Sequence, residues 1–235
     1  MVSPSTFGPF RRFLLVLLIV IAAIVTLMAD QQARALFRGS NEVLVDVTAW
    51  ALRIGIWLLP WLIWPGHWDL GSLKPRWSWT ILLMVLWLLP NLLFRDSNAN
   101  GLSLSRALFV GMCIGIWEEI VFRGYALSGC ETNRPRLAIL LSALGFAALH
   151  IGYPIGNLIV SFFVGIGFGI VRITSGSLVG CVVAHGLIDA LDDGASPPEF
   201  VLITVAAITA VTTVLLLWKH PVFRETTPGI TRTAL

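Results

Sequence analysis

Two adjacent glutamates, Glu118 and Glu119, lie within an otherwise apolar stretch of the chain. A charged side chain at membrane depth costs about 3 kcal/mol or more unless it is paired or neutralised, so such residues usually mark function. Two later apolar segments carry His150 and His185, and Asp189 follows His185 by four residues. Carboxylates and imidazoles are the side chains that most often transfer protons in catalysis. The pattern therefore predicts an active site that works by acid–base chemistry.

The two glutamates differ in the partners that their own helix offers. Residues four apart share a helical face, so Glu119 stacks against Arg123 and can form an ion pair with it. Glu118 is rotated by about 100° around the helix and has no such partner. We interpret Glu119 and Arg123 as a structural clamp, and Glu118 as the group that faces a polar cavity for acid–base chemistry. A single structural charge network of all three residues is the alternative.

His185 and Asp189 are four residues apart, so both project from one face of their helix. Asp189 could orient His185, supply a base or help to bind a metal. Another charged residue, Arg53, lies in the middle of an apolar stretch and also needs a partner. Asp46 or a carboxylate from elsewhere in the chain could serve.

Composition assigns the chain to the helical membrane proteins. Of its 235 residues, 57% are hydrophobic and only 12% are charged, whereas a soluble domain is about 25% charged. Apolar runs of roughly 17–25 residues recur along the chain, the length that spans a bilayer as a helix. The net charge of +3 and the spread of the basic residues do not suggest nucleic-acid binding. The three cysteines match no zinc or disulfide framework, and we interpret them as packing residues.

We expect an all-α, polytopic membrane protein with about eight transmembrane helices around an intramembrane polar cavity. The whole chain, residues 1–235, forms one transmembrane domain, with a catalytic core at about 100–195 and three further helices within 1–95. The helices are predicted at about 13–29, 43–64, 78–94, 103–127, 137–151, 156–172, 177–191 and 199–218.

The distribution of basic residues gives the orientation. With the N-terminus in the cytoplasm, eleven Lys and Arg residues fall on the inside and four on the outside, which agrees with the positive-inside rule and puts both termini in the cytoplasm. A cleavable signal peptide is the alternative for the first helix, because Ala33-Arg-Ala35 resembles a cleavage site. In the favoured topology, a rise of about 1.5 Å per residue brings the acid and histidine side chains into one slab nearer the cytoplasm.

Three motifs resemble those of a known family. Glu118-Glu119-Ile-Val-Phe-Arg123 matches EExxxR, Phe146-Ala-Ala-Leu-His150 matches FxxxH, and His185-Gly-Leu-Ile-Asp189 matches HxxxN/D. In this order they are similar to the signatures of the CAAX-protease and bacteriocin-processing (CPBP) family of intramembrane proteases, which are related to the prenyl-protein endopeptidases. The resemblance covers about residues 100–195, and the three helices within 1–95 carry no recognisable signature.

The resemblance implies an intramembrane endopeptidase. Glu118 would activate a water molecule for attack on a peptide carbonyl, assisted by His150, while His185 and Asp189 would stabilise the oxyanion. Phe146, Glu119 and Arg123 would be structural supports. A tetrahedral oxyanion at low dielectric needs preorganised hydrogen-bond donors. The prenyl proteases have Asn at the last position, and Asp189 can donate a hydrogen bond only when it is protonated.

Cofactor use stays open at this point. We favour a glutamate mechanism without a metal, although His150, His185, Glu118 and Asp189 could together hold Zn²⁺ with an open position for water. The partners implied are a membrane-associated protein or peptide as substrate and the lipid bilayer itself. The short loops indicate a bacterial inner-membrane protein.

Two other functional classes remain as alternatives. Acid and histidine residues within the membrane also form the proton relays of transporters, so a proton-coupled transporter is one alternative. The other is a non-catalytic membrane protein that binds a peptide, such as an immunity protein.

Overall fold

The computed structural model describes residues 9–37, 42–63, 77–94, 104–130, 134–153, 155–192 and 198–219. In this part of the chain the regular secondary structure is helical, apart from isolated bridge residues at Ile151, Tyr153 and Ser177. The expected all-α class is therefore confirmed. The helices are α1 (Pro9–Leu36), α2 (Glu42–Ile63), α3 (Trp77–Leu93), α4 (Leu104–Glu119), η2 (Ile120–Ala126), α5 (Leu127–Cys130), α6 (Pro135–Ala148), α7 (Ile155–Ser175), α8 (Leu178–Asp192) and α9 (Glu199–Lys219).

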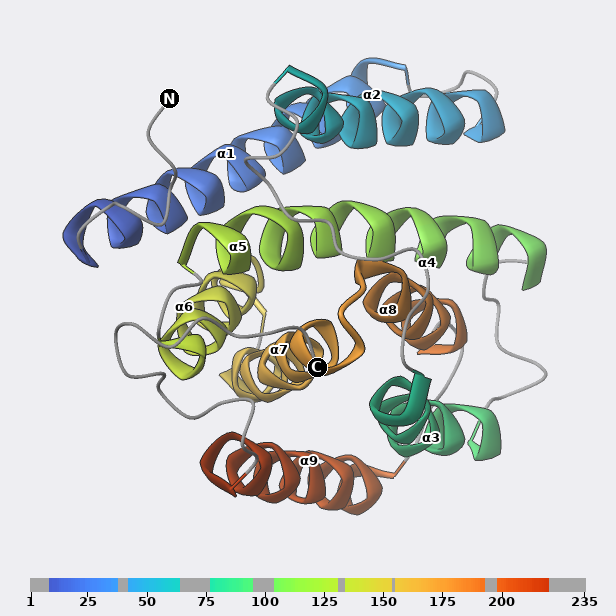
Figure 1. Ribbon diagram of the computed structural model, residues 1–235. Helices are drawn as coiled ribbons and strands as arrows, with labels where there is room; N and C mark the ends of the chain where they lie inside the picture. Colours follow the sequence, from blue (N-terminus) through green and yellow to red (C-terminus); the bar gives the residue numbers. More distant parts are fainter. Residues whose placement is uncertain are drawn as a thin grey trace.

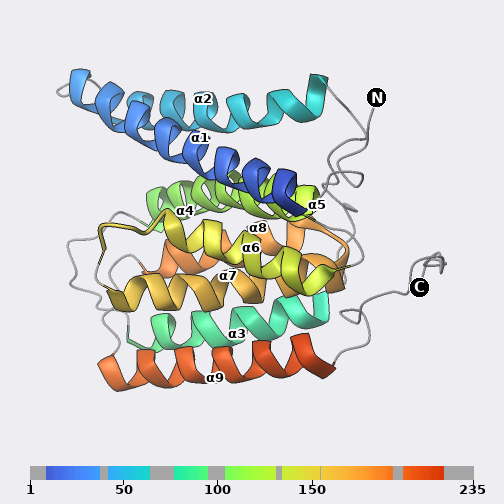
Figure 2. The same ribbon diagram turned by 90° about the vertical axis from the view of Figure 1, so that its left-hand side faces the viewer.

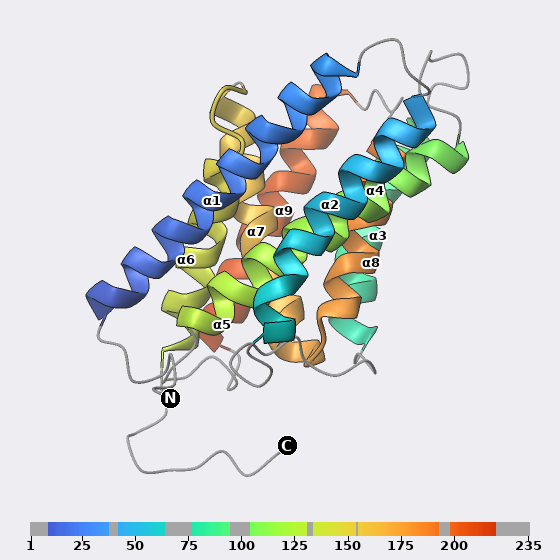
Figure 3. The same ribbon diagram turned by 90° about the horizontal axis from the view of Figure 1, so that it is seen from above.

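Helix α4 lies near the centre of the bundle (Figure 1). On one side it packs against α8, and the helices α1 and α2 cover its other side (Figure 1). Figure 3 looks onto α1 and α2, with α4 and α5 beneath them. Beyond α8, helix α3 packs against α8 and α9 packs against α7, while α6 packs on α7 (Figure 2). The catalytic segment expected at 100–195 thus forms the middle layers of the bundle.

Glycines bring α4 and α8 into backbone contact. A Cβ atom added at Gly111 would lie 2.5 Å from the Gly186 carbonyl oxygen, and one at Gly115 would lie 2.7 Å from the Gly186 nitrogen. Small residues at four-residue spacing allow two helices in a membrane to approach closely. Glu118 follows Gly111 and Gly115 on the same face of α4, so this crossing carries it toward His185 of α8.

The outer surface of the bundle is apolar. Large hydrophobic side chains of α1, α2, α3 and α9 are exposed, as expected where lipid replaces water. By length and hydropathy alone, two stretches among the described residues meet the requirement for a spanning helix, Leu17–Leu36 and Ile155–Ser175. The chain is a polytopic helical membrane protein, and the number of its spans stays a prediction.

The fourth predicted helix differs from expectation in its second half. We expected one α-helix over 103–127, whereas the structure has seven π-helical residues, Ile120–Ala126, followed by α5. The Leu127 amide donates to the Phe122 carbonyl, and the Ser142 hydroxyl of α6 donates to the same oxygen at 2.7 Å. This contact from another helix supports the wider turn. Wide turns of this kind are rare and are frequent at functional sites.

Candidate active site

His185 of α8 lies at the centre of a cluster of carboxylates. Its Nδ1 atom is 2.8 Å from Oε1 of Glu119, which is a hydrogen bond. Its Nε2 atom faces two further carboxylates, with Oε2 of Glu118 at 3.7 Å and Oδ2 of Asp189 at 3.5 Å. Both of these distances exceed that of a good hydrogen bond. The ring is therefore fixed at one nitrogen and presents the other to the two remaining acids.

Glu119 is held by a buried ion pair. Its side chain is fully buried, and its Oε1 atom accepts a hydrogen bond from Nη1 of Arg123 at 3.0 Å. The second terminal nitrogen of Arg123 donates to the Gly165 carbonyl of α7 at 2.9 Å. The ion pair predicted from the four-residue spacing is thus present. Its contacts join the α4–η2 segment to both α7 and α8.

Aromatic rings enclose the same cluster. The Phe168 ring stacks on His185 with centroids 4.8 Å apart, and the Phe146 ring meets His185 edge-on at 5.6 Å. The Arg123 guanidinium lies over both rings, 4.6 Å from the centroid of Phe146 and 5.2 Å from that of Phe168. These rings exclude water from Glu119 and Arg123 and restrict the orientation of the imidazole. Phe146 was expected as a structural support, and its contacts suit that role.

The two glutamates also differ in the exposed fraction of their side chains. The Glu118 side chain is 12% exposed and that of Asp189 is 28% exposed, whereas that of Glu119 is completely buried. Glu118 and Asp189 thus flank the side of the His185 ring that a substrate or water molecule can reach. Of the two glutamates, Glu118 is the one that can meet a substrate or a water molecule without rearrangement of the core.

His150 lies beside the cluster, and the Phe146 ring contacts both imidazoles. The His150 ring packs on Phe146 with centroids 5.2 Å apart, and its Nδ1 atom is 3.1 Å from the Phe146 carbonyl oxygen. A carbonyl oxygen can only accept, so Nδ1 carries the proton and Nε2 of the neutral ring is the acceptor. No hydrogen bond or ion pair within the described part of the chain joins His150 to Glu118 or His185.

The arrangement of donor atoms does not make a metal site as it stands. Among the described residues, no group of three or more His, Cys, Asp or Glu side chains is placed to hold one ion. Nδ1 of His185 is bonded to Glu119, which leaves Nε2 as the only nitrogen of this ring that could bind a metal, and Nδ1 of His150 faces the Phe146 carbonyl oxygen. A zinc site of the kind considered above needs these ligands to converge on one point about 2 Å from each donor atom.

Sequence reasoning missed two residues of the site. Phe168 and the Gly165 carbonyl both lie on α7, a helix in which the sequence offered no catalytic motif. The only signal was the small-residue series Ser161, Gly165 and Gly169, which indicates close helix packing. A Cβ atom at Gly165 would lie 3.1 Å from Cα of Ala143 in α6.

The partner of Arg53 is Asp30 of α1, and Asp46 is not its partner. Asp46 instead binds Arg34 of α1, and it also accepts a hydrogen bond from Arg106 of α4 at 2.9 Å. Arg34 in turn bonds to Asp30 at 2.9 Å. The prediction that Arg53 needs a carboxylate was right. Of the two alternatives left open, Asp46 and a carboxylate from elsewhere in the chain, the structure has the second, and Asp46 binds two other arginines.

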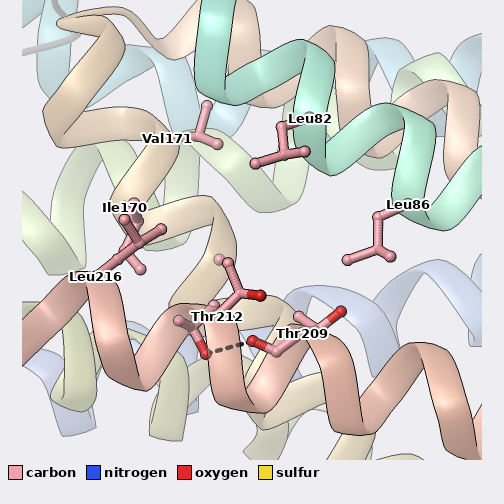
Figure 4. A pocket seen from close by; sticks show the side chains of 9 residues that line it. Leu82, Leu86, Ile170, Val171, Thr209, Thr212 and Leu216 are labelled. Atoms are coloured by element: carbon pink, nitrogen blue, oxygen red, sulfur yellow. Dashed lines mark hydrogen bonds between the residues drawn. The ribbon is translucent and has the colours of Figure 1, made fainter.

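A small apolar hollow lies away from these groups, between α3, α7 and α9 (Figure 4). The side chains of Thr209 and Thr212 project into it from α9 (Figure 4). Its lining residues are Leu82, Leu86, Gly167, Ile170, Val171, Thr209, Thr212, Thr213 and Leu216. None of the acids or histidines of the cluster lines this hollow.

Comparison with protein families supports the resemblance seen in the motifs. Residues 100–191 match the family described as type II CAAX prenyl endopeptidase Rce1-like. This segment is Rce1-like. The match runs from just before α4 to the last turn of α8, so it includes Glu118, His150, His185 and Asp189 and leaves α1, α2 and α3 outside. In this segment the chain is therefore similar to the CAAX-type proteases of the membrane. No curated protein and no solved structure matches the chain.

Proposed function

We propose that this Rce1-like protein is an intramembrane endopeptidase in which Glu118 activates the attacking water. The observation that carries the proposal is the pairing of a partly exposed Glu118 with the Nε2 atom of His185 at 3.7 Å. This gap leaves room for a third polar group that contacts both atoms. A carboxylate in a largely apolar setting is suited to general base catalysis, which contributes about 10²–10⁴-fold to a rate.

Glu119 has a separate task in this mechanism. Because its carboxylate accepts the hydrogen bond from His185, Nδ1 carries a proton and Nε2 points toward Glu118 and Asp189. The Arg123 contact and the complete burial of Glu119 keep this acceptor in place. Glu119 is thus a positioning residue, and the chemistry falls to the more accessible Glu118.

His185 and Asp189 then stabilise the oxyanion of the tetrahedral intermediate. In its imidazolium form, His185 also carries a proton on Nε2 and can donate to a developing oxyanion on the open side of the ring. Asp189 donates only when protonated, and it otherwise orients the imidazole. His150, which packs on Phe146, assists by accepting a proton at Nε2 once the substrate or a water molecule reaches it.

The substrate is a membrane-associated protein or peptide that approaches within the bilayer, and the mechanism needs no metal. Helix α1 begins and α9 ends at the same end of the bundle (Figure 2), which supports the proposal that both termini lie in the cytoplasm. We further propose the bacterial inner membrane as its location.

The test is cleavage of a peptide library by detergent-purified protein. Wild type and Glu118→Gln are compared, each with and without a strong chelator, and products are identified by mass spectrometry. The proposal expects cleavage by wild type in both conditions and none by Glu118→Gln. Loss of wild-type cleavage in the chelator would refute the metal-free mechanism. Equal cleavage by Glu118→Gln would refute the role of Glu118.

A further inference from the structure

Helix α2 lies outside the Rce1-like segment, yet it contacts the continuous helical segment α4–η2, which carries Glu118, at three levels. At the start of α4, Arg106 donates to Asp46 of α2. Below the active site, the Tyr125 hydroxyl donates to the Trp57 carbonyl of α2. Between these two levels, Arg53 of α2 lies over the Trp117 ring. Helix α2 itself lies on the side of α4 that points away from α8 (Figure 1).

The contact between Arg53 and Trp117 places a buried cation beside the turn of α4 that leads into the glutamate pair. The Arg53 side chain is only 5% exposed, and its guanidinium carbon is 4.3 Å from the Trp50 ring centroid and 4.7 Å from that of Trp117. Its carboxylate partner is Asp30 of α1, and its Nε atom has no hydrogen-bond partner among the described residues. Trp117 immediately precedes Glu118 in the chain.

Stability alone does not explain why an arginine is buried at this position. Replacing a buried ion pair by apolar residues of similar volume is often neutral or stabilising, so such a pair is weak support for a purely structural role. The active-site cluster supplies another reason, because it holds three carboxylates, Glu118, Glu119 and Asp189, against the two basic side chains Arg123 and His185. Arg53 adds a third positive charge beside the helical turn that contains Trp117 and Glu118.

We propose that Arg53 is a positioning residue for Glu118. It holds the Trp117 turn of α4 against α2, and it supplies the balancing positive charge from the side of the helix opposite His185. The Asp30 carboxylate fixes the guanidinium between the two tryptophan rings. The role of Arg53 in catalysis rests on the proposed function. The coupling between Arg53 and Glu118, by contrast, is a property of the folded protein and can be measured without turnover.

The first arm of the test is a double-mutant cycle on thermal unfolding of the purified protein. The four proteins are wild type, Arg53→Met, Glu118→Gln and the double variant. If the Arg53 charge acts on Glu118, the loss in Tm caused by Arg53→Met is smaller in the Glu118→Gln background by about 2–4 °C. Equal losses in the two backgrounds would overturn the proposal.

Two further variants keep this arm decisive. Arg34→Gln removes another cation of the same group of ion pairs, and among the described residues no ring contact joins Arg34 to Trp117. Its effect on Tm is expected to add to that of Glu118→Gln. Asp30→Asn keeps Arg53 but removes its carboxylate partner, so on this proposal Glu118 becomes the anion that balances the Arg53 charge. Glu118→Gln is then expected to cost about 2–4 °C more in Tm than it does in wild type. No extra cost would overturn the proposal, and this holds even where Arg53→Met does not fold.

The second arm uses cleavage. Arg53→Met is expected to lower kcat about tenfold or more with KM nearly unchanged, because a misplaced general base affects the chemical step. Arg53→Lys keeps the charge and is expected to recover part of the lost kcat. A rise in KM alone, or no recovery with lysine, contradicts the positioning role. Absence of cleavage in wild type would refute the proposed function and leave the result of the unfolding arm standing.

Discussion

The packing of α4 on α8 predicts a large effect from a single methyl group at Gly115. A Cβ atom there would lie 2.7 Å from the Gly186 nitrogen and 2.9 Å from the Val182 carbonyl oxygen. Both are backbone atoms, so no side-chain rotation relieves the contact. Ordinary van der Waals contact begins at 3.4 Å, and the two helices must therefore separate by about 0.7 Å.

This separation would break the central contact of the site. The His185 Nδ1 atom is 2.8 Å from Glu119 Oε1, and adding the displacement gives about 3.5 Å, beyond the usual range of a hydrogen bond. Overpacking of this kind costs about 1–3 kcal/mol, and alanine in a helix recovers about 0.5–1 kcal/mol relative to glycine. A net cost of about 1–2 kcal/mol corresponds to a Tm lower by about 2–8 °C.

The assay measures Tm and the rate of peptide cleavage for Gly115→Ala and for a matched control, Gly55→Ala. Gly55 lies in α2 with no atom within 4 Å of an added Cβ, so its variant should keep wild-type activity and gain slightly in stability. Gly115→Ala should lose cleavage by about 10²-fold, as expected for a misplacement approaching 1 Å. A Gly115→Ala protein with wild-type Tm and wild-type cleavage would refute the reasoning.

Three other substitutions separate positioning from chemistry. Glu119→Gln leaves two buried basic side chains without their carboxylate, so we expect about 3–5 kcal/mol of destabilisation in thermal unfolding; a Tm equal to that of wild type would contradict the clamp. Asp189→Asn introduces an amide donor beside His185, and cleavage should be maintained or raised; a tenfold loss would show that the carboxylate itself is required. Ser142→Ala removes one of two hydrogen bonds to the Phe122 carbonyl, so Tm should fall by about 2–4 °C with cleavage retained, and lost cleavage with a normal Tm would argue against a supporting role.

The spacing of residues along the chain predicted the features that depend on a single helix. All eight helical segments were recognised from apolar runs, and the Glu119–Arg123 pair followed from residues four apart on one face. The His185–Asp189 proximity followed from the same rule. Such contacts are fixed by helical geometry and are therefore readable from the sequence.

Contacts between helices could not be read in the same way. The bond from His185 to Glu119 joins residues 66 positions apart, and nothing in the spacing decides whether an imidazole meets Glu118 or Glu119. The π-helical turn depends on the Ser142 hydroxyl of another helix, and the partner of Arg53 depends on how α1 crosses α2. These features require the relative placement of helices, which is set by side-chain packing across the whole bundle.

The central claim is that Glu118 supplies the base, and the rate of a single turnover tests it most directly. Wild type and Glu118→Gln are reconstituted in lipid vesicles with a cleaved peptide from the library, at enzyme in excess, and Tm is measured on the same samples. The mechanism predicts a loss of at least about 10²-fold in the cleavage rate, with a Tm within a few degrees of wild type. A Glu118→Gln protein that cleaves within about tenfold of wild type would contradict it.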